Sequence, residues 1–197
     1  MPKKVLTRFY KNGIPNGLVV KLFNLLTAKM TYSDNFLAEI FESVKTIAMV
    51  GASPNWVRPS HFAMKYLQRK RFRVIPVNPN VEEKSILGEK TYPNLTSIPE
   101  NFEMVDIFRN SDAASSITDD AIELAKLKGI KVVWMQLDVQ NDEAASRAEK
   151  AGLKVVMNRC PKIEFARLYG ELNWSGVNTN IISAKRPRLR KSAMTHD

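Results

Sequence analysis

The stretch TIAMVGASPNWVRPSHFAMKYLQRKR, residues 46–71, decides the fold of this chain. It opens with the apolar run Ile47–Val50, which is typical of a buried strand, and then turns through Gly51-Ala52-Ser53. Apolar residues recur near helical spacing after Pro59, and proline suits the first position of a helix because its missing N–H group would have no partner there. A strand, a turn of small residues and a helix together form the unit with which α/β proteins hold a pyrophosphate.

Four further apolar runs alternate with helical patterns along the rest of the chain. The predicted strands cover residues 73–77, 104–108, 131–137 and 154–157, and the predicted helices cover 34–43, 113–128, 141–151 and 161–168. Such alternation implies a parallel sheet with helices on both faces. We therefore expect an α/β, Rossmann-like, doubly wound sheet of five strands in the order 3-2-1-4-5. Ligands would sit at the carboxyl ends of the strands, at a switch point between strands 1 and 4.

The formal charge of +10 lies at the two ends of the 197-residue chain. Residues 1–33 carry +6 and residues 185–197 carry +4, which leaves residues 34–184 neutral. Basic tails bind polyanions without reading bases, so we expect no specific nucleic-acid partner. We divide the chain into a basic N-terminal extension (1–32), one domain (33–170) and a C-terminal extension with a basic tail (171–197).

Several classes of protein are disfavoured by composition. One cysteine, Cys160, and two histidines argue against a disulfide framework and predict no metal site. No apolar run approaches the roughly 20 residues that span a bilayer, so we expect no membrane span and a cytoplasmic location. Three interpretations of residues 1–29 stay open: an amphipathic surface helix, a targeting peptide, or an extension upstream of a true start at Met30, which we favour.

The turn lacks the two common nucleotide signatures. The dinucleotide fingerprint needs three glycines, and only Gly51 is present. The second strand ends in Asn78-Pro79 rather than in the acid that would hold a ribose 2′-hydroxyl, and the Walker phosphate loop is absent. The sequence thus predicts a site for a phosphorylated ligand, while it disfavours a nicotinamide cofactor.

Six blocks in order carry a family resemblance. They are GASPNWVRPSH (51–61), YLQRKRFRVIPVNPN (66–80), ILGEKTYPNL (86–95), DIFRNSD (106–112), VVWMQLDVQNDEAASRAEKAGLKVV (132–156) and NRCPKIEF (158–165). From about Val44 to Leu168 the chain resembles the small stand-alone coenzyme A-binding proteins, which are similar to the CoA-binding domain of the succinyl-CoA synthetase α subunit. The resemblance implies a Rossmann-like domain that holds CoA at the strand carboxyl ends.

The resemblance also implies a set of CoA-binding residues. The set is Gly51, Ala52, Ser53, Arg58, Ser60, Val77, Asn78, Pro79, Phe108 and Arg109. The pyrophosphate would contact Gly51, Ala52, Ser53 and Arg58. The adenosine end with its 3′-phosphate would lie beside residues 77–79, and the pantetheine would lie beside Phe108 and Arg109. The sequence departs from the family at Asp138, where glycine is usual, and it offers no second domain with the phosphate-carrying histidine of a ligase. We interpret His61 as a helix-start residue that faces a loop.

We expect a non-catalytic module that binds or senses coenzyme A or an acyl-CoA. A homodimer is compatible with this interpretation. We find no nucleophile, base and orienting group together, so no catalytic residue is proposed. Two alternatives stay open: a partner-dependent acyl-CoA ligase or transferase subunit, and an NAD(P)-binding oxidoreductase-like protein. Cys160 has two interpretations. It is either a thiol activated by Arg159 and Lys162 or, as we favour, a small buried residue.

Overall fold

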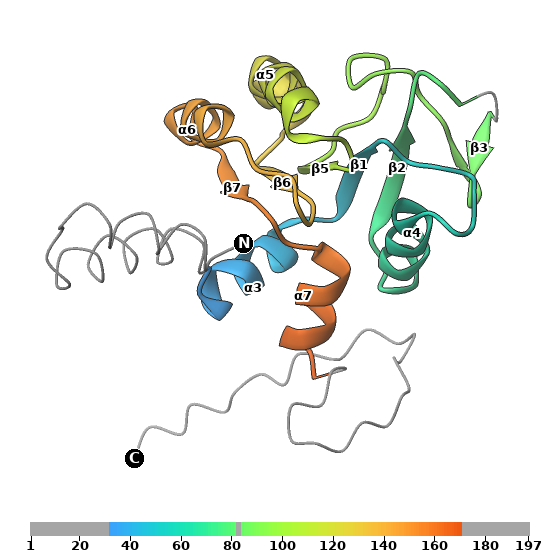
Figure 1. Cartoon of the computed structure of the whole chain (residues 1–197), viewed down its shortest axis with the longest axis horizontal. Helices are drawn as coiled ribbons and strands as arrows, with labels where there is room; N and C mark the ends of the chain where they lie inside the picture. The colour runs from blue at the N-terminus through green and yellow to red at the C-terminus, as the bar shows by residue number, and fades with distance from the viewer. Residues whose placement is uncertain (1–31, 82–83, 171–197) are drawn as a thin grey trace, which may run out of the picture. The chain divides into compact units, whose positions relative to one another are not determined.

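The computed structural model describes residues 32–81 and 84–170 (Figure 1). Its elements, in chain order, are α3 (Asp34–Ser43), β1 (Thr46–Val50), α4 (Pro59–Arg69), β2 (Arg73–Val77), β3 (Ser85–Ile86), β4 (Glu89–Lys90), β5 (Met104–Ile107), α5 (Ser111–Lys128), β6 (Val132–Met135), α6 (Asp142–Lys150), β7 (Lys154–Val156) and α7 (Pro161–Leu168). Every predicted strand and helix is present, with bounds that differ by at most two residues. The predicted C-terminal extension lies outside the described residues, as does nearly all of the N-terminal one.

Five of the strands form one parallel sheet in the order β2-β1-β5-β6-β7. This confirms the Rossmann-like α/β class. Counted along the chain, however, the order is 2-1-3-4-5, so the expected order 3-2-1-4-5 was wrong. The switch point consequently lies between β1 and β5, and not between the first and fourth strands.

Pro76 explains why β2 lies at the edge of the sheet. Its carbonyl accepts a hydrogen bond of 3.0 Å from the Tyr92 N–H group on the outer side of β2. In a parallel strand the N–H and C=O groups of one residue point to the same side, so the missing N–H group of Pro76 also faces outward. A further sheet strand there would need that donor. The crossover after β2 covers this edge instead, through an isolated bridge from Val77 to Tyr92.

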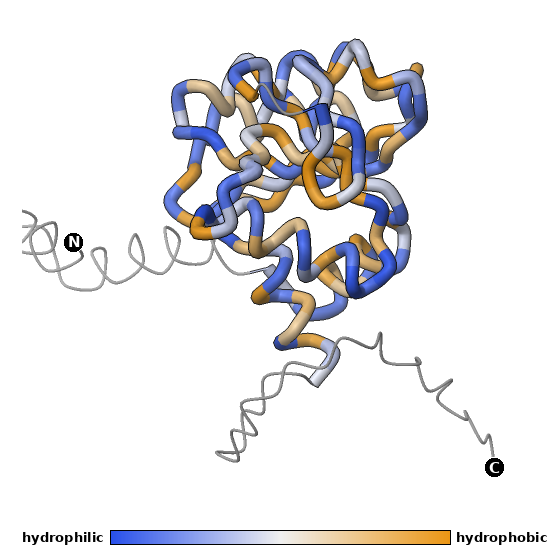
Figure 2. Tube along the Cα trace, turned by 90° about the vertical axis from the view of Figure 1, so that its right-hand side faces the viewer, coloured by the Kyte–Doolittle hydropathy of each residue, from blue (hydrophilic) through white to orange (hydrophobic). Residues whose placement is uncertain are grey.

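Helices cover both faces of the sheet, with α5 and α6 on one face and α3, α4 and α7 on the other (Figure 1). Aromatic rings fill the second face: the Phe165 ring lies 5.3 Å from Phe41 and 5.5 Å from Phe72, and Phe41 lies 5.5 Å from Trp134. Trp134 is fully buried, as expected for a core residue. Figure 2 shows hydrophobic and hydrophilic residues alternating over short distances along the trace, which is the pattern of amphipathic helices around a buried sheet.

Polar caps fix the helix ends near the carboxyl edge of the sheet. Asn110 accepts a hydrogen bond of 3.0 Å from the Ala113 N–H group at the start of α5, and Asn141 accepts one of 2.9 Å from Ala144 at the start of α6. Gly129 ends α5 in the left-handed conformation. Asparagine at an N-cap and glycine just after the last helical turn are residues that helix ends favour. Within the described part of the chain, no helix has the length and apolar character needed to cross a membrane.

Candidate ligand site at the carboxyl edge of the sheet

Gly51 joins the carboxyl ends of three strands. Its N–H group donates to the Val77 carbonyl at 2.8 Å, and the Phe108 N–H group donates to the Val50 carbonyl at 2.8 Å. The φ angle of Gly51 is +88°, and a Cβ atom there would collide with the Phe108 carbonyl oxygen and reach 3.0 Å from Cδ of Arg109. Only glycine lets the β1 turn lie this close to the end of β5.

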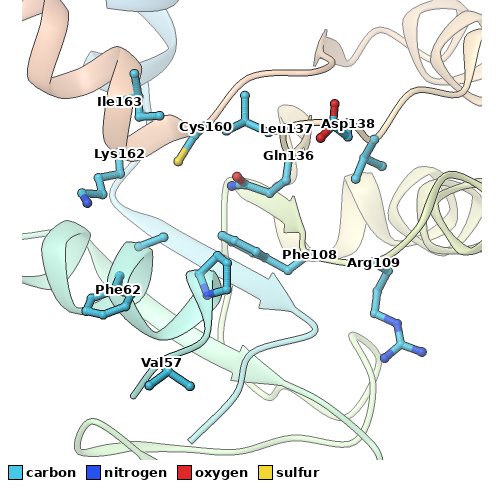
Figure 3. Close-up of a pocket in the computed structure, with 13 residues that line it drawn as sticks. Val57, Phe62, Phe108, Arg109, Gln136, Leu137, Asp138, Cys160, Lys162 and Ile163 are labelled. Carbon is cyan, nitrogen blue, oxygen red and sulfur yellow. The ribbon is translucent and has the colours of Figure 1, made fainter. Parts of the chain in front are cut away.

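A larger pocket, of about 630 Å³, opens at the start of α4, the ends of β5 and β6 and the start of α7 (Figure 3). Its apolar lining consists of Val57, Pro59, Phe62, Ala63, Phe108, Leu137, Val139 and Ile163. Its polar lining consists of Arg109, Gln136, Asp138, Cys160 and Lys162. Mostly apolar walls with a few polar groups are typical of a small-molecule site.

A smaller pocket, of about 210 Å³, lies on the side of β2 and α5. It is lined by Val50, Gly51, Val77, Asn78, Pro79, Pro93, Asn94, Leu95, Arg109, Ala113, Ile117 and Asp120. Arg109 is exposed and lines both pockets, so its guanidinium could contact a ligand that extends from one to the other. Arginine offers a fork of donors that suits phosphate oxygens.

The structure brings six of the ten predicted site residues to these pockets. Gly51 and the segment 77–79 line the smaller pocket, Phe108 lines the larger one, and Arg109 lines both. Phe108 is half-buried.

The other four predicted residues line neither pocket. Ala52 and Ser60 are buried, and the Ala52 carbonyl accepts a hydrogen bond of 2.8 Å from the Asn78 side chain. Ser53 accepts a hydrogen bond of 3.2 Å from the Asn55 N–H group, and Arg58 is exposed at the N-cap of α4. These residues lie along the turn between β1 and α4, so they stay candidates for contact with a ligand at that helix start.

His61 faces the same turn, because its Nδ1 atom lies 3.2 Å from the Ser53 carbonyl oxygen. This agrees with a helix-start histidine that stabilises a loop. No group of three or more His, Cys, Asp or Glu side chains able to hold a metal ion occurs among residues 32–81 and 84–170.

Beneath the larger pocket lies a buried carboxyl group that the sequence analysis did not select. Asp106 is fully buried in β5, and its Oδ1 accepts a hydrogen bond of 2.8 Å from Nε2 of Gln136. Burial raises the pKa of Asp106 to about 7, and the hydrogen bond from Gln136 acts in the opposite direction. A lone acid inside the apolar run MVDIF was the signal that could have singled it out.

Cys160 is buried where α7 begins. Burial raises the pKa of its thiol and the charge of Asp106 acts in the same direction, while the backbone N–H groups of Ile163 and Lys162 and the charge of Lys162 oppose the shift without reversing it. The interpretation of Cys160 as a thiol activated by its basic neighbours is therefore wrong, and the buried interpretation is confirmed.

Asp138 has a φ angle of +63°, in the left-handed region. Its N–H group donates to Oδ1 of Asn158 at 2.9 Å, which fixes this turn beside the larger pocket. Glycine adopts this left-handed backbone without strain, which explains why glycine is usual at this position in the resembled family. Aspartate can also adopt it as a single residue, so the turn tolerates Asp138.

A parallel five-stranded sheet with paired pockets at its carboxyl edge defines a Rossmann-like α/β protein. Residues 45–166 match the family model of the CoA binding domain, and the chain belongs to that family. It is 32% identical over 130 residues to "Uncharacterized protein YneT" of Bacillus subtilis, a match that covers 66% of this chain and 92% of the relative.

Two solved structures illustrate the same similarity. A hypothetical protein from Pyrococcus horikoshii OT3 is 40% identical, with a TM-score of 0.64, and the match covers 70% of this chain and 92% of that one. A protein from Thermus thermophilus is 30% identical, with a TM-score of 0.62, and the match covers 70% of this chain and all of the other.

Proposed function

We propose that this chain binds coenzyme A or an acyl-CoA across the two pockets, as a non-catalytic binding or sensor module. The observation that carries the proposal is the position of Arg109, which lines both pockets at the switch point of the sheet. A ligand with a nucleotide at one end and a long arm at the other could place one end in each pocket, with Arg109 between them. Membership of the CoA binding domain family supports the same ligand.

The ligand would be held in three parts. The adenosine end with its 3′-phosphate would enter the smaller pocket, beside Val77, Asn78 and Pro79. The pantetheine arm would enter the larger pocket along Phe108.

The pyrophosphate would lie between these ends. It would meet the turn from Gly51 through Ala52 and Ser53, with Arg58 and Ser60 at the start of α4. The N–H group of Ser60 in the first helical turn and the positive end of the helix dipole favour an anion there.

The test is calorimetry of the purified chain with CoA, dephospho-CoA, NAD and ATP. We expect CoA to bind more tightly than dephospho-CoA, because only CoA carries the 3′-phosphate. Tight binding of NAD without a response to CoA would contradict the proposal.

Arg109→Ala should weaken CoA binding by about tenfold or more, since charge-assisted hydrogen bonds to phosphate are among the stronger polar contacts. Arg69→Ala is the matched control, because Arg69 is exposed in the last turn of α4 and lines neither pocket. An equal effect of the two substitutions would indicate only a general loss of positive charge.

A further inference from the structure

We propose that Gln136, held by Asp106, is the hydrogen-bond acceptor with which the larger pocket recognises an amide N–H group of the pantetheine arm. The inference rests on the proposed binding of CoA. It adds that Gln136 determines which part of the ligand the larger pocket recognises. Gln136 would touch the ligand, and Asp106 would act through Gln136 as a positioning residue.

Burying Asp106 in the sheet costs free energy. Its neighbours in the sheet are Met49 of β1 and Trp134 of β6, and the residue has no exposed surface. One carboxyl oxygen accepts from Gln136, while Oδ2 has no hydrogen-bond partner in the described part of the chain. A buried carboxyl group with one partner is costly, and an aliphatic side chain would suit this strand better. Buried ionisable groups with unsatisfied hydrogen-bonding atoms occur preferentially at functional sites.

Asp106 fixes the orientation of the Gln136 side chain. Above its pKa of about 7, the ionised carboxylate of Asp106 can only accept hydrogen bonds, so the Gln136 side chain must then present its NH₂ group to it. The Nε2–Oδ1 distance of 2.8 Å agrees with this. The amide oxygen, Oε1, is then the atom left for the pocket, and no residue in the described ranges donates a hydrogen bond to it. Figure 3 shows the amide directed into the pocket between Phe108 and Cys160.

Oε1 of Gln136 can recognise only a hydrogen-bond donor. Gln136 is only 6% exposed, and its neighbours in the pocket are largely apolar, so an acceptor covered by a ligand needs a donor from that ligand. Phosphate and thioester oxygens are acceptors and would not satisfy Oε1. The two amide N–H groups of the pantetheine arm are donors of the required kind. Because the proposed placement puts the pantetheine arm, and not the adenosine end, in the larger pocket, these amide N–H groups are the donors within reach of Gln136.

The experiment compares CoA with adenosine 3′,5′-bisphosphate, which carries the nucleotide end without the pantetheine arm. At pH 8, above the pKa of Asp106, Gln136→Leu should weaken CoA binding by about tenfold and leave the bisphosphate within about twofold. Gln140→Leu is the matched control, because Gln140 is exposed and lies outside the larger pocket. The melting temperature of each variant is measured to check that it is folded.

The role of Asp106 is tested by rescue. Asp106→Leu removes the partner of Nε2 and should reproduce the selective loss of CoA affinity. Asp106→Asn keeps an oxygen that can accept from Gln136 and should keep most of the affinity. Full CoA affinity in the leucine variant would overturn the positioning role.

Three results would overturn the inference in distinguishable ways. Unchanged CoA binding by Gln136→Leu would overturn the acceptor role alone. Equal losses for CoA and the bisphosphate would indicate a purely structural residue and would also overturn it. Failure of the unaltered chain to bind CoA would overturn the proposed function together with this inference.

Discussion

At the scale of single residues, Asp106 links the stability of the chain to pH. Its pKa is about 7 in the folded chain against an ordinary value of 3.8, because burial disfavours the charged form. Between about pH 4 and pH 7 the folded state keeps a proton that the unfolded state has released. The contribution of Asp106 to stability therefore falls as the pH rises through this window and levels off above it.

The prediction is a pH-dependent difference between the unaltered chain and Asp106→Asn, which does not titrate. Between pH 5 and pH 8 the unaltered chain should lose about 3 kcal/mol of unfolding free energy relative to the variant, from 1.36 kcal/mol per pH unit over about two units. Denaturant unfolding at the two pH values measures it. Parallel profiles would show that Asp106 is already charged in the folded chain over this pH range.

Asp106 and Gln136 also show where prediction from sequence stopped at the residue scale. The predicted site consisted of residues in the turns after the first three strands, and six of the ten do line the pockets. The partnership of an acid inside β5 with a residue after β6 depends on which strands are neighbours and on their register. Neither follows from spacing along the chain.

At the scale of elements, the junction of β1, β2 and β5 depends on Gly51. Gly51→Ala combines a left-handed φ angle with a collision against the backbone of Phe108. We expect it to lower the unfolding free energy by about 2–5 kcal/mol, from roughly 1–2 kcal/mol for the φ angle and roughly 1–3 kcal/mol for overpacking. Thermal or denaturant unfolding measures the loss.

Gly152→Ala separates the two causes. Gly152 has a similar φ angle of +87°, and an added Cβ would meet nothing within 4 Å. This variant should lose only about 1–2 kcal/mol, the cost of the φ angle alone. Equal losses at the two positions would contradict the close approach of the β1 turn to the end of β5.

The order of the strands illustrates what element-level patterns can and cannot predict. The periodicity of apolar residues located every strand and helix, because burial fixes it locally. The third strand of the sheet, β5, could pair either with the outer edge of β2 or with the free edge of β1. Pro76 contained that information, since proline favours an edge, but the expected order placed β2 inside the sheet.

At the scale of the whole molecule, charge and the proposed ligand site occupy different parts of the chain. Residues 34–184 carry no net charge, and the excess of +10 lies at the ends. Counterion release should give the ends a weak affinity for any DNA sequence, an affinity that falls steeply with salt. The proposed recognition of CoA depends instead on residues between β1 and the start of α7.

Because the two regions are separate, substitutions in the basic end and in the proposed CoA site should each change one binding affinity and leave the other unchanged. Replacing Arg186, Arg188 and Arg190 with Gln should weaken DNA binding at low salt and leave CoA affinity within about twofold, because each removed cation removes about one released counterion. Arg109→Ala should do the reverse. Fluorescence anisotropy with a short duplex and calorimetry with CoA measure the two affinities. If the triple variant lost CoA binding as well, the basic end would be part of the CoA site, and the neutral body would not suffice for recognition.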